Sequence, residues 1–284
     1  MHSHRPHHSA RPENPRISVV VPTLNEARNL EVVLPELMAA ADIHEVIVVD
    51  GGSVDDTIAT ARRLLPDAVI CRQARRGKGN ALATGFARVT GEVVVMFDAD
   101  GSADPAEIPA FVAALTAGAD FAKGSRFTEG GGSADITAVR RAGNEFLNTV
   151  MNRGFGTRFS DLCYGYNAFW ADQLPVLDLP EHDRLGPADG TMLWGDGFEI
   201  ETVINCRFAA AGVRITEVPS VERPRIFGSS NLHAVNDGMR VLRTIRTERA
   251  RARRSGHLDR LSRTVRSGQA VRRNGAGDLA RLAS

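Results

Sequence analysis

Acidic side chains stand where apolar, β-branched segments of the chain end. Asp50 ends one such segment, Asp98 and Asp100 follow another, and Glu26 follows a third after a short turn. Carboxylates that share a crevice repel one another and any phosphate. A divalent cation removes both problems, because Mg²⁺ and Mn²⁺ prefer hard oxygen ligands and bridge carboxylates to a diphosphate. The pattern predicts a metal site for a phosphate-bearing ligand, with Asp98 and Asp100 as the metal ligands.

The two carboxylates of the Asp98-Ala99-Asp100 triplet are not expected to act as equal metal ligands in an extended strand. We predict either a turn at Ala99 or a division of roles, in which Asp100 holds the metal and Asp98 contacts a ribose or shares the metal through water. An Asp-x-Asp triplet alone is usually a solvated loop or a helix cap. The apolar residues 93–97 before it favour the site.

Two further residues carry alternatives of their own. Lys78 lies in a Gly77-Lys78-Gly79 turn, where it either contacts phosphate or is simply solvated. Asp50 either contacts the ligand or caps the helix that follows Gly51. The joint pattern of strand-end residues is the reason to favour the ligand in both cases.

The first half of the chain alternates strands with helices. Predicted strands cover residues 17–21, 45–49, 68–71, 92–97 and 120–123, and predicted helices cover residues 26–41, 54–65, 79–89 and 107–116, with Asn25 as the first cap. This alternation predicts an α/β domain with a mostly parallel, Rossmann-like central sheet that is covered on both faces. Ligands bind such sheets beyond the carboxyl ends of the strands, which is where the acids stand.

The second half is less regular. Gly130-Gly131-Gly132 predicts a flexible loop, and residues 175–195 an irregular one. Predicted helices cover residues 139–153, 198–211 and 233–254, and predicted strands cover residues 163–170 and 213–218.

Composition excludes several classes of protein. The 284 residues are 43% hydrophobic and 24% charged, with a net charge of +1, which is an ordinary globular balance. Three cysteines without a CxxC pair predict a reduced, cytoplasmic protein without a zinc site. Residues 1–15, which contain His2, His4, His7 and His8, read as a disordered leader rather than a signal segment.

Five ordered segments resemble glycosyltransferase family 2, in particular its dolichyl-phosphate mannose synthase-like branch of polyprenyl-phosphate sugar synthases. They are VVPTLNE at 20–26, VDGGS at 49–53, DAD at 98–100, GSRF at 124–127 and SDL at 160–162 followed by Gly165-Tyr166. GFEIE at 197–201 and EVP at 217–219 complete the order. The resemblance runs from about Ile17 to Ile245.

The resemblance implies a glycosyltransferase A-type fold and an inverting, metal-dependent hexosyltransferase. The donor would be a UDP- or GDP-sugar, and the acceptor a polyprenyl phosphate or another acceptor. The metal would be Mg²⁺ or Mn²⁺. The implied nucleotide-site residues are Pro22, Thr23, Asn25, Glu26, Asp50, Gly51, Lys78, Asp98, Ala99 and Asp100. Arg126 and Arg225 are the cations expected near phosphate.

Three positions depart from the branch's pattern. Asn231 stands where its Arg-x-x-Gly-x-Ser-Lys-Leu loop has lysine, and Asn167 replaces an arginine. Ser102 replaces a glutamine that would be the third metal contact. The family's frequent C-terminal transmembrane helices are also absent from this sequence. The two lost cations weaken the inference of a phosphate acceptor more than that of the donor.

A hydroxyl acceptor would need a carboxylate to take its proton, whereas an anionic phosphate would not. The candidate bases are Asp161, Glu199 and Asp196. Glu199 opens a helix and has a capping role as its alternative. Asp196, between two glycines, is expected to be an exposed turn residue.

The predicted organisation is a leader at 1–15, a glycosyltransferase catalytic domain at 16–245 and a basic, flexible tail at 246–284. Arginines give the last helix a cationic face. Either this face attracts anionic lipid headgroups, or it is simply a solvated helix surface. They are Arg240, Arg243, Arg246, Arg249, Arg251, Arg253 and Arg254. We expect a cytoplasmic enzyme. Peripheral attachment at the inner face of the membrane is the alternative. Nucleic acid is not expected as a partner, because no base-reading motif accompanies the arginines.

Two other functions remain open. A sugar nucleotidyltransferase also needs α/β architecture and a metal, but it has a glycine-rich loop after its first strand, and residues 22–26 contain no glycine. A non-catalytic nucleotide-sugar-binding subunit would not need the intact Asp98 and Asp100 pair. Metal-dependent release of UDP or GDP would distinguish the transferase from both.

Overall fold

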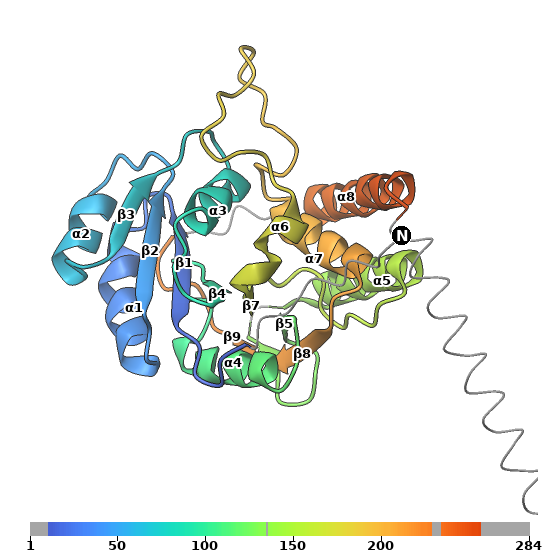
Figure 1. The fold of residues 1–284 in the computed structure, drawn as a ribbon, viewed down its shortest axis with the longest axis horizontal. Helices are drawn as coiled ribbons and strands as arrows, with labels where there is room; N and C mark the ends of the chain where they lie inside the picture. Colours follow the sequence, from blue (N-terminus) through green and yellow to red (C-terminus); the bar gives the residue numbers. More distant parts are fainter. Residues whose placement is uncertain (1–10, 135, 229–233, 257–284) are drawn as a thin grey trace, which may run out of the picture.

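Strands of the first half pair in parallel, as the alternation of strands and helices predicts. The computed structural model describes residues 11–134, 136–228 and 234–256 (Figure 1). Within them, a seven-stranded sheet has the order β3-β2-β1-β4-β7-β5-β8, and only β7 runs antiparallel to its neighbours. The strands are β1 (Ile17–Thr23), β2 (Glu45–Asp50), β3 (Val69–Arg72), β4 (Val93–Met96), β5 (Phe121–Ser125), β7 (Asn167–Trp170) and β8 (Ile215–Pro219). The predicted α/β fold with a mostly parallel sheet is confirmed.

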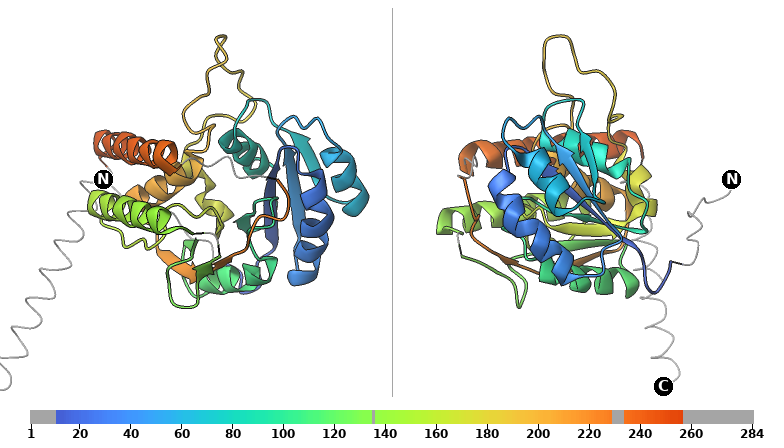
Figure 2. Two further views of the ribbon diagram at one scale, coloured as in Figure 1. Left: turned by 180° about the vertical axis from the view of Figure 1, so that it is seen from behind. Right: turned by 90° about the vertical axis from the view of Figure 1, so that its left-hand side faces the viewer.

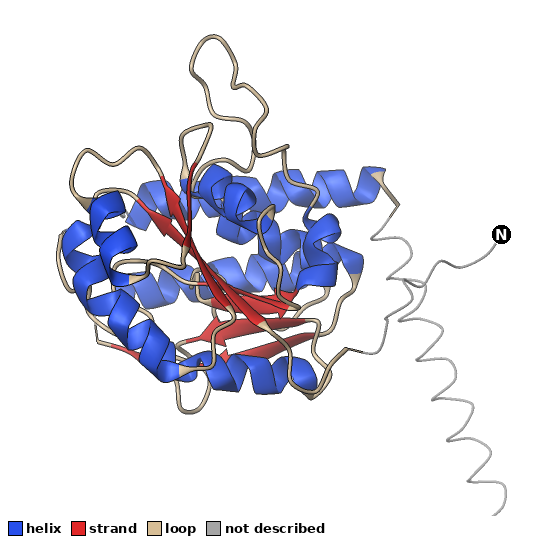
Figure 3. Ribbon diagram, turned by 60° about the vertical axis from the view of Figure 1, so that its left-hand side comes forward, coloured by secondary structure: helices blue, strands red, loops and turns tan. Residues whose placement is uncertain are grey.

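Helices cover both faces of the twisted sheet (Figures 1 and 3). They are α1 (Ala27–Ala40), α2 (Thr57–Leu64), α3 (Lys78–Phe86), α4 (Ile108–Thr116), α5 (Ala138–Phe155), α6 (Leu174–Leu177), α7 (Ile200–Ala211) and α8 (Ala234–Arg254). Short 3₁₀ turns, η1 (Pro105–Glu107) and η2 (Ala171–Gln173), precede α4 and α6. Val19 and Val21 of β1 pack in one core cluster with α1 and α4, and Val20 packs in the other with α3, α5 and α7. Burial on both faces explains why β1 is continuously apolar.

Several elements differ from their predicted bounds. The strand predicted at 163–170 begins at Asn167, and the loop predicted at 175–195 begins inside α6. The predicted glycine loop contains β6 (Gly132–Ser133), which pairs with β9 (Val221–Glu222). Two-residue strands carry too short a pattern to be recognised in a sequence. The remainder of the connection between α6 and α7 projects from the body of the molecule (Figures 1 and 2).

Asn25 does not cap α1, contrary to the prediction. The cap is Glu26, whose carbonyl accepts the N–H of Leu30 at 2.9 Å. Asn25 has a φ of 56°, and its side-chain oxygen accepts the N–H of Val54 at 2.8 Å. The amide therefore stabilises the neighbouring loop instead of its own helix.

The ends of the predicted domain differ from the folded region. Residues 11–15 are described, and the Arg11 guanidinium lies 2.6 Å from Asp120 and stacks on the Trp170 ring. At the other end, α8 continues past residue 245 to Arg254. The leader histidines, Asn231 and the tail from residue 257 lie outside the described residues. None of the described helices has the length and apolar content that crossing a bilayer requires.

Candidate active site

The carboxyl ends of three neighbouring strands bring the predicted residues to one edge of the sheet. Thr23 of β1 pairs with Asp50 of β2, and Val20 of β1 pairs with Met96 of β4. The turn that contains Asn25, the end of β2 and the Asp98 turn therefore lie in a row, with β1 in the middle. This is the crevice position at which open α/β sheets bind ligands.

A turn separates the two carboxylates of the triplet from the strand. β4 ends at Met96, the N–H of Phe97 still bonds to the Val20 carbonyl at 3.0 Å, and a turn begins at Ala99. Asp98 therefore lies beyond the end of the strand, and Asp100 lies on the turn itself. Of the two arrangements predicted for the triplet, the structure has the turn.

Asp98 binds a partly buried lysine. The Lys78 Nζ lies 2.7 Å from Oδ1 and 2.8 Å from Oδ2 of Asp98, and 2.6 Å from Oε1 of Glu201 on α7. Burial alone would lower the pKa of Lys78, but the two carboxylates outweigh it and raise that pKa. The pKa of Asp98 is also raised, by burial and by the acids Asp100 and Glu201, against the opposing effect of Lys78. Lys78 is therefore part of the acidic crevice and is not a solvated turn residue, which was one of its two predicted alternatives.

Asp100 binds an arginine from the other end of the chain. The Nη2 of Arg225 lies 2.9 Å from Oδ2 of Asp100, and its Nη1 lies 3.3 Å from Glu26. Ser102 donates its N–H and its hydroxyl to Oδ1 of Asp100, at 3.0 and 2.7 Å. The hydroxyl of Ser102 thus orients Asp100 in this structure.

Residues 223–228 form a strap across this edge. The N–H of Ile226 bonds to the Asp100 carbonyl at 3.1 Å, and the N–H of Phe227 bonds to Asn29 of α1 at 3.0 Å. Gly101 has a φ of 79°, and a Cβ there would lie 2.4 Å from the Ile226 side chain. The strap therefore packs on a glycine of the turn, and this contact places Arg225 over Asp100.

The donor set fits a divalent cation that shares its coordination with a ligand. Asp98, Asp100, Glu26 and Glu201 supply four carboxylates against the two cations Lys78 and Arg225, an excess of two formal negative charges. Among the described residues, no group of three or more His, Cys, Asp or Glu side chains is placed to hold a metal ion by itself. Mg²⁺ is commonly bound by one or two carboxylates together with substrate phosphates, which is what one Asp-x-Asp turn offers.

The residues predicted to contact the nucleoside hold the loop that follows β2 in its conformation. Asp50 is 1% exposed and accepts the N–H groups of Gly52 and Ser53 at 3.0 and 3.1 Å. Thr23 donates its hydroxyl to the Val49 carbonyl, and the N–H of Gly51 bonds to the Thr23 carbonyl at 2.8 Å. These side chains fix the shape of the loop beside the crevice.

Close backbone packing explains the glycines beside Lys78. A Cβ on Gly77 would lie 2.1 Å from the Asp196 carbonyl oxygen, and one on Gly79 would lie 1.8 Å from that of Gly195. The N–H of Gly79 bonds to the same Asp196 carbonyl at 2.7 Å. The loop at 195–197 therefore seals the start of α3 and positions Lys78.

Replacing Gly79 with alanine should destabilise the protein by about 2 kcal/mol or more, because the new methyl group meets rigid backbone. Urea unfolding measures the change. Gly143→Ala is the matched control, since it lies in α5 with nothing within 4 Å of its added Cβ. That change should stabilise by about 0.5–1 kcal/mol through helix propensity. Equal stability of the two variants would contradict the close packing.

Asp196 is buried, so the expectation of an exposed turn residue was wrong. It is 1% exposed, and both of its oxygens bind Arg75, at 2.6 and 2.9 Å. Arg75 also donates to the carbonyls of Glu181 and Arg184. One guanidinium thus anchors the base of the projecting α6–α7 connection to the first half of the sheet.

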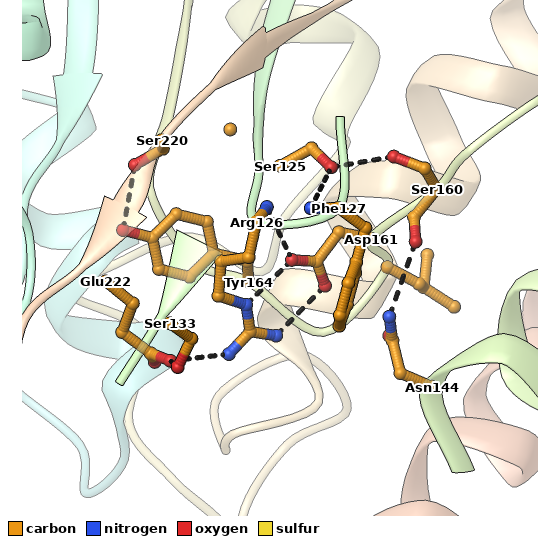
Figure 4. Close-up of polar contacts among 12 residues, drawn as sticks. Ser125, Arg126, Phe127, Ser133, Asn144, Ser160, Asp161, Tyr164, Ser220 and Glu222 are labelled. Carbon is orange, nitrogen blue, oxygen red and sulfur yellow. Dashed lines mark hydrogen bonds and ion pairs between the residues drawn. The ribbon is translucent and has the colours of Figure 1, made fainter. Parts of the chain in front are cut away.

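Arg126 and Asp161 form a second group of site candidates (Figure 4). The guanidinium binds both oxygens of Asp161, at 2.7 and 3.0 Å, and also Glu222 at 3.0 Å. Asp161 is fully buried, and Arg126 stacks on the ring of Tyr164. Burial would raise the pKa of Asp161, but Arg126 and Lys123 outweigh it and lower that pKa. These two site candidates bind each other.

Comparison with known proteins bears on this geometry. The family model described as Glycosyl transferase family 2 matches residues 18–172. The chain belongs to glycosyl transferase family 2. Polyprenol monophosphomannose synthase of Mycolicibacterium smegmatis is 32% identical over 229 residues, which cover 78% of this chain and 82% of the relative. Undecaprenyl-phosphate mannosyltransferase of Micrococcus luteus is 31% identical over 228 residues, which cover 76% and 87%.

A solved structure shares the fold. Glucosyl-3-phosphoglycerate synthase of Mycobacterium tuberculosis, crystallised with Mn²⁺, UDP and glucosyl-3-phosphoglycerate, superposes with a TM-score of 0.62 at 22% identity. The match covers 84% of this chain and 81% of that one. The resemblance seen in the sequence motifs and the glycosyltransferase A-type fold are therefore confirmed.

Glu199 of this glycosyltransferase stabilises the loop before its own helix. Its Oε1 accepts the N–H groups of Gly195 and Gly197 at 3.0 and 3.2 Å. It makes no side-chain cap to α7, although it occupies the cap position. The carboxylate therefore supports the segment that packs on Gly79.

Two site residues of this family 2 enzyme were missed in the sequence. Glu201 bonds to Lys78, and its only signal was its place in the GFEIE segment. Lys123 is fully buried in β5, where its Nζ bonds to the carbonyls of Tyr164 and Gly124. Burial lowers the pKa of Lys123. A lysine inside an apolar strand was the signal for that residue.

Proposed function

We propose that this glycosyltransferase moves a sugar from UDP- or GDP-sugar to a polyprenyl phosphate, with inversion at the anomeric carbon. The observation that carries the proposal is the Asp98–Asp100 turn with Lys78 and Arg225 against it, at the carboxyl edge of the sheet. The relatives named as mannosyltransferases of polyprenyl phosphates support the acceptor, and the neighbour crystallised with Mn²⁺ and UDP supports the donor.

The residues of the crevice divide the work of catalysis. Asp98 and Asp100 would hold Mg²⁺ or Mn²⁺, which neutralises charge on the leaving diphosphate when bound. Lys78 and Arg225 supply further positive charge at the same edge, where charge develops as the bond to the sugar breaks. The loop fixed by Asp50 provides a wall against which the nucleoside can lie.

The acids predicted as bases favour an acceptor that needs none. Asp161 and Asp196 are buried in ion pairs with Arg126 and Arg75, and Glu199 accepts two backbone N–H groups. A phosphate oxygen is already anionic and can attack without losing a proton. A polyprenyl phosphate therefore agrees with the state of these three carboxylates better than a hydroxyl acceptor does.

A panel of nucleotide sugars tests the proposal. Thermal shift with and without Mn²⁺ should show one UDP- or GDP-sugar that stabilises the protein in a metal-dependent way, because only the folded state binds it. The stabilising donor is then incubated with polyprenyl phosphate and Mn²⁺, and release of UDP or GDP is followed. Turnover that consumes or releases pyrophosphate instead would replace the transferase by a nucleotidyltransferase.

The lipid acceptor would bring the enzyme to a membrane surface, and α8 offers the charges for it. Five of its arginines are exposed, while Arg251 pairs with Asp178 and Arg249 lies against Gly154 of α5. The exposed ones are Arg240, Arg243, Arg246, Arg253 and Arg254.

The double variant Arg243→Gln, Arg246→Gln should bind anionic phosphatidylglycerol vesicles on the order of 30-fold more weakly, at about 1 kcal/mol per charge. Cosedimentation measures the binding. Arg62→Gln, Arg63→Gln removes two exposed arginines from α2 and serves as the matched control. If both double variants lose binding equally, net charge and not α8 directs the protein to the lipid.

A further inference from the structure

Every oxygen of the Asp98–Asp100 pair already has a donor. Both oxygens of Asp98 lie within 2.8 Å of the Lys78 ammonium. In Asp100, Oδ1 accepts from Ser102 and Oδ2 binds Arg225. A divalent cation that binds these carboxylates therefore meets a positive charge beside each of them, and displacement of Lys78 or Arg225 favours its binding.

Each of the two cations also has a second acid outside the triplet. Lys78 binds Glu201 of α7 at 2.6 Å, and Arg225 binds Glu26 at the start of α1 at 3.3 Å. The two arrangements are alike: one cation lies between one triplet carboxylate and one anchoring carboxylate. A cation that leaves the triplet therefore still has an anchoring carboxylate to hold it at the crevice.

We propose that Lys78 and Arg225 are exchangeable counter-ions. They form ion pairs with Asp98 and Asp100 in the metal-free enzyme, and the divalent cation displaces them from these carboxylates when it binds. This inference rests on the function proposed above. Glu201 and Glu26 keep the displaced cations at the crevice, where they become available to the diphosphate. Lys78 and Arg225 thus position charge for the reaction and also make metal binding and nucleotide binding depend on each other.

The exchange predicts effects of opposite sign for one substitution. Without a competing cation, Lys78→Met and Arg225→Met should each bind Mn²⁺ about tenfold more tightly than wild type when no nucleotide is present. With Mn²⁺ saturating, the same variants should bind UDP or GDP about tenfold more weakly, because a cation for the diphosphate is missing. A purely structural role of either residue would weaken both.

Mn²⁺ titration of the full chain, followed by electron paramagnetic resonance of the free ion, measures the first effect. Isothermal calorimetry with UDP and with GDP measures the second. Arg223→Met is the matched control, since Arg223 lies on the same strap but pairs with Asp104 and Glu36. It should leave Mn²⁺ affinity within about twofold of wild type, because surface pairs of this kind contribute little.

The outcomes separate this inference from the proposed function. If Asp100→Asn abolishes Mn²⁺ binding but neither Lys78→Met nor Arg225→Met tightens it, the exchange is wrong and the metal site stands. If Asp100→Asn binds Mn²⁺ like wild type, the proposed metal site itself fails. If Lys78→Met does not fold, Arg225→Met decides alone. The side chain of Arg225 is 32% exposed, so its replacement does not break a buried ion pair. Equal tightening by Arg223→Met would also overturn the exchange.

Discussion

Asp100→Asn should lower the rate of sugar transfer by on the order of 10³-fold while the fold is retained. The substitution removes the charge that would hold the metal against the leaving diphosphate. The amide oxygen still accepts from Ser102, so the turn keeps its internal bonds. Only the contact with Arg225 loses its ionic character, and that pair is partly exposed, which limits the cost in stability to about 1 kcal/mol.

Single-turnover kinetics with the donor identified by thermal shift measures this loss, and the melting temperature of the same sample reports the fold. Asp104→Asn makes the same chemical change on the same loop. Asp104 caps η1 and pairs with Arg223 of the strap, outside the triplet. Activity of Asp104→Asn close to wild type would place the effect in the triplet. A tenfold or smaller loss in Asp100→Asn would remove Asp100 from the metal site.

The triplet and the strands could be predicted because their signals are local. The apolar run of β4 and the acids directly after it occupy adjacent positions, and parallel strands place their carboxyl ends at one edge. The turn at Ala99 was one of the two arrangements predicted for the triplet, the other being a division of roles between the two acids. No partner from elsewhere in the chain was needed for either step.

Partners distant in sequence decided what could not be predicted. Asp196 between two glycines has every local mark of an exposed turn, and its burial depends on Arg75, 121 residues away. Lys78 was ambiguous for the same reason, because Glu201 lies 123 residues from it. Gly77 and Gly79 were predicted only to form a turn, yet their small size serves the packing of the 195–197 loop. A sequence shows that a glycine is present, and only the fold shows what approaches it.

The pair of Arg126 and Asp161 illustrates a third limit. Each residue was a reasonable site candidate on the strength of its motif. In the structure they satisfy one another, so their first role is to join the end of β5 to the segment before β7. Motif order identified residues that matter without identifying what each of them contacts.

Arg126→Met should therefore destabilise the protein by about 3–5 kcal/mol, because it leaves the carboxylate of Asp161 buried without its bidentate partner. Urea unfolding at neutral pH measures the change. Arg16→Met is the matched control. Arg16 also makes a bidentate pair, with Glu92, but these side chains are 52% and 35% exposed, so the unfolding midpoint should move little.

The pH dependence of this loss distinguishes a stranded charge from lost packing. In wild type the pKa of Asp161 lies below its ordinary value of 3.8, so the pair stabilises the fold above that pH and the contribution disappears as pH falls through the lower folded pKa. Without Arg126, burial is the largest remaining influence and raises that pKa. The variant is then penalised at neutral pH and relieved as the acid takes up a proton. The difference in unfolding free energy between wild type and Arg126→Met should narrow from about pH 7 to about pH 5. A difference in unfolding free energy that stays constant across that range would mean that methionine destabilises the protein through poor packing. It would also mean that Arg126 does not keep Asp161 ionised.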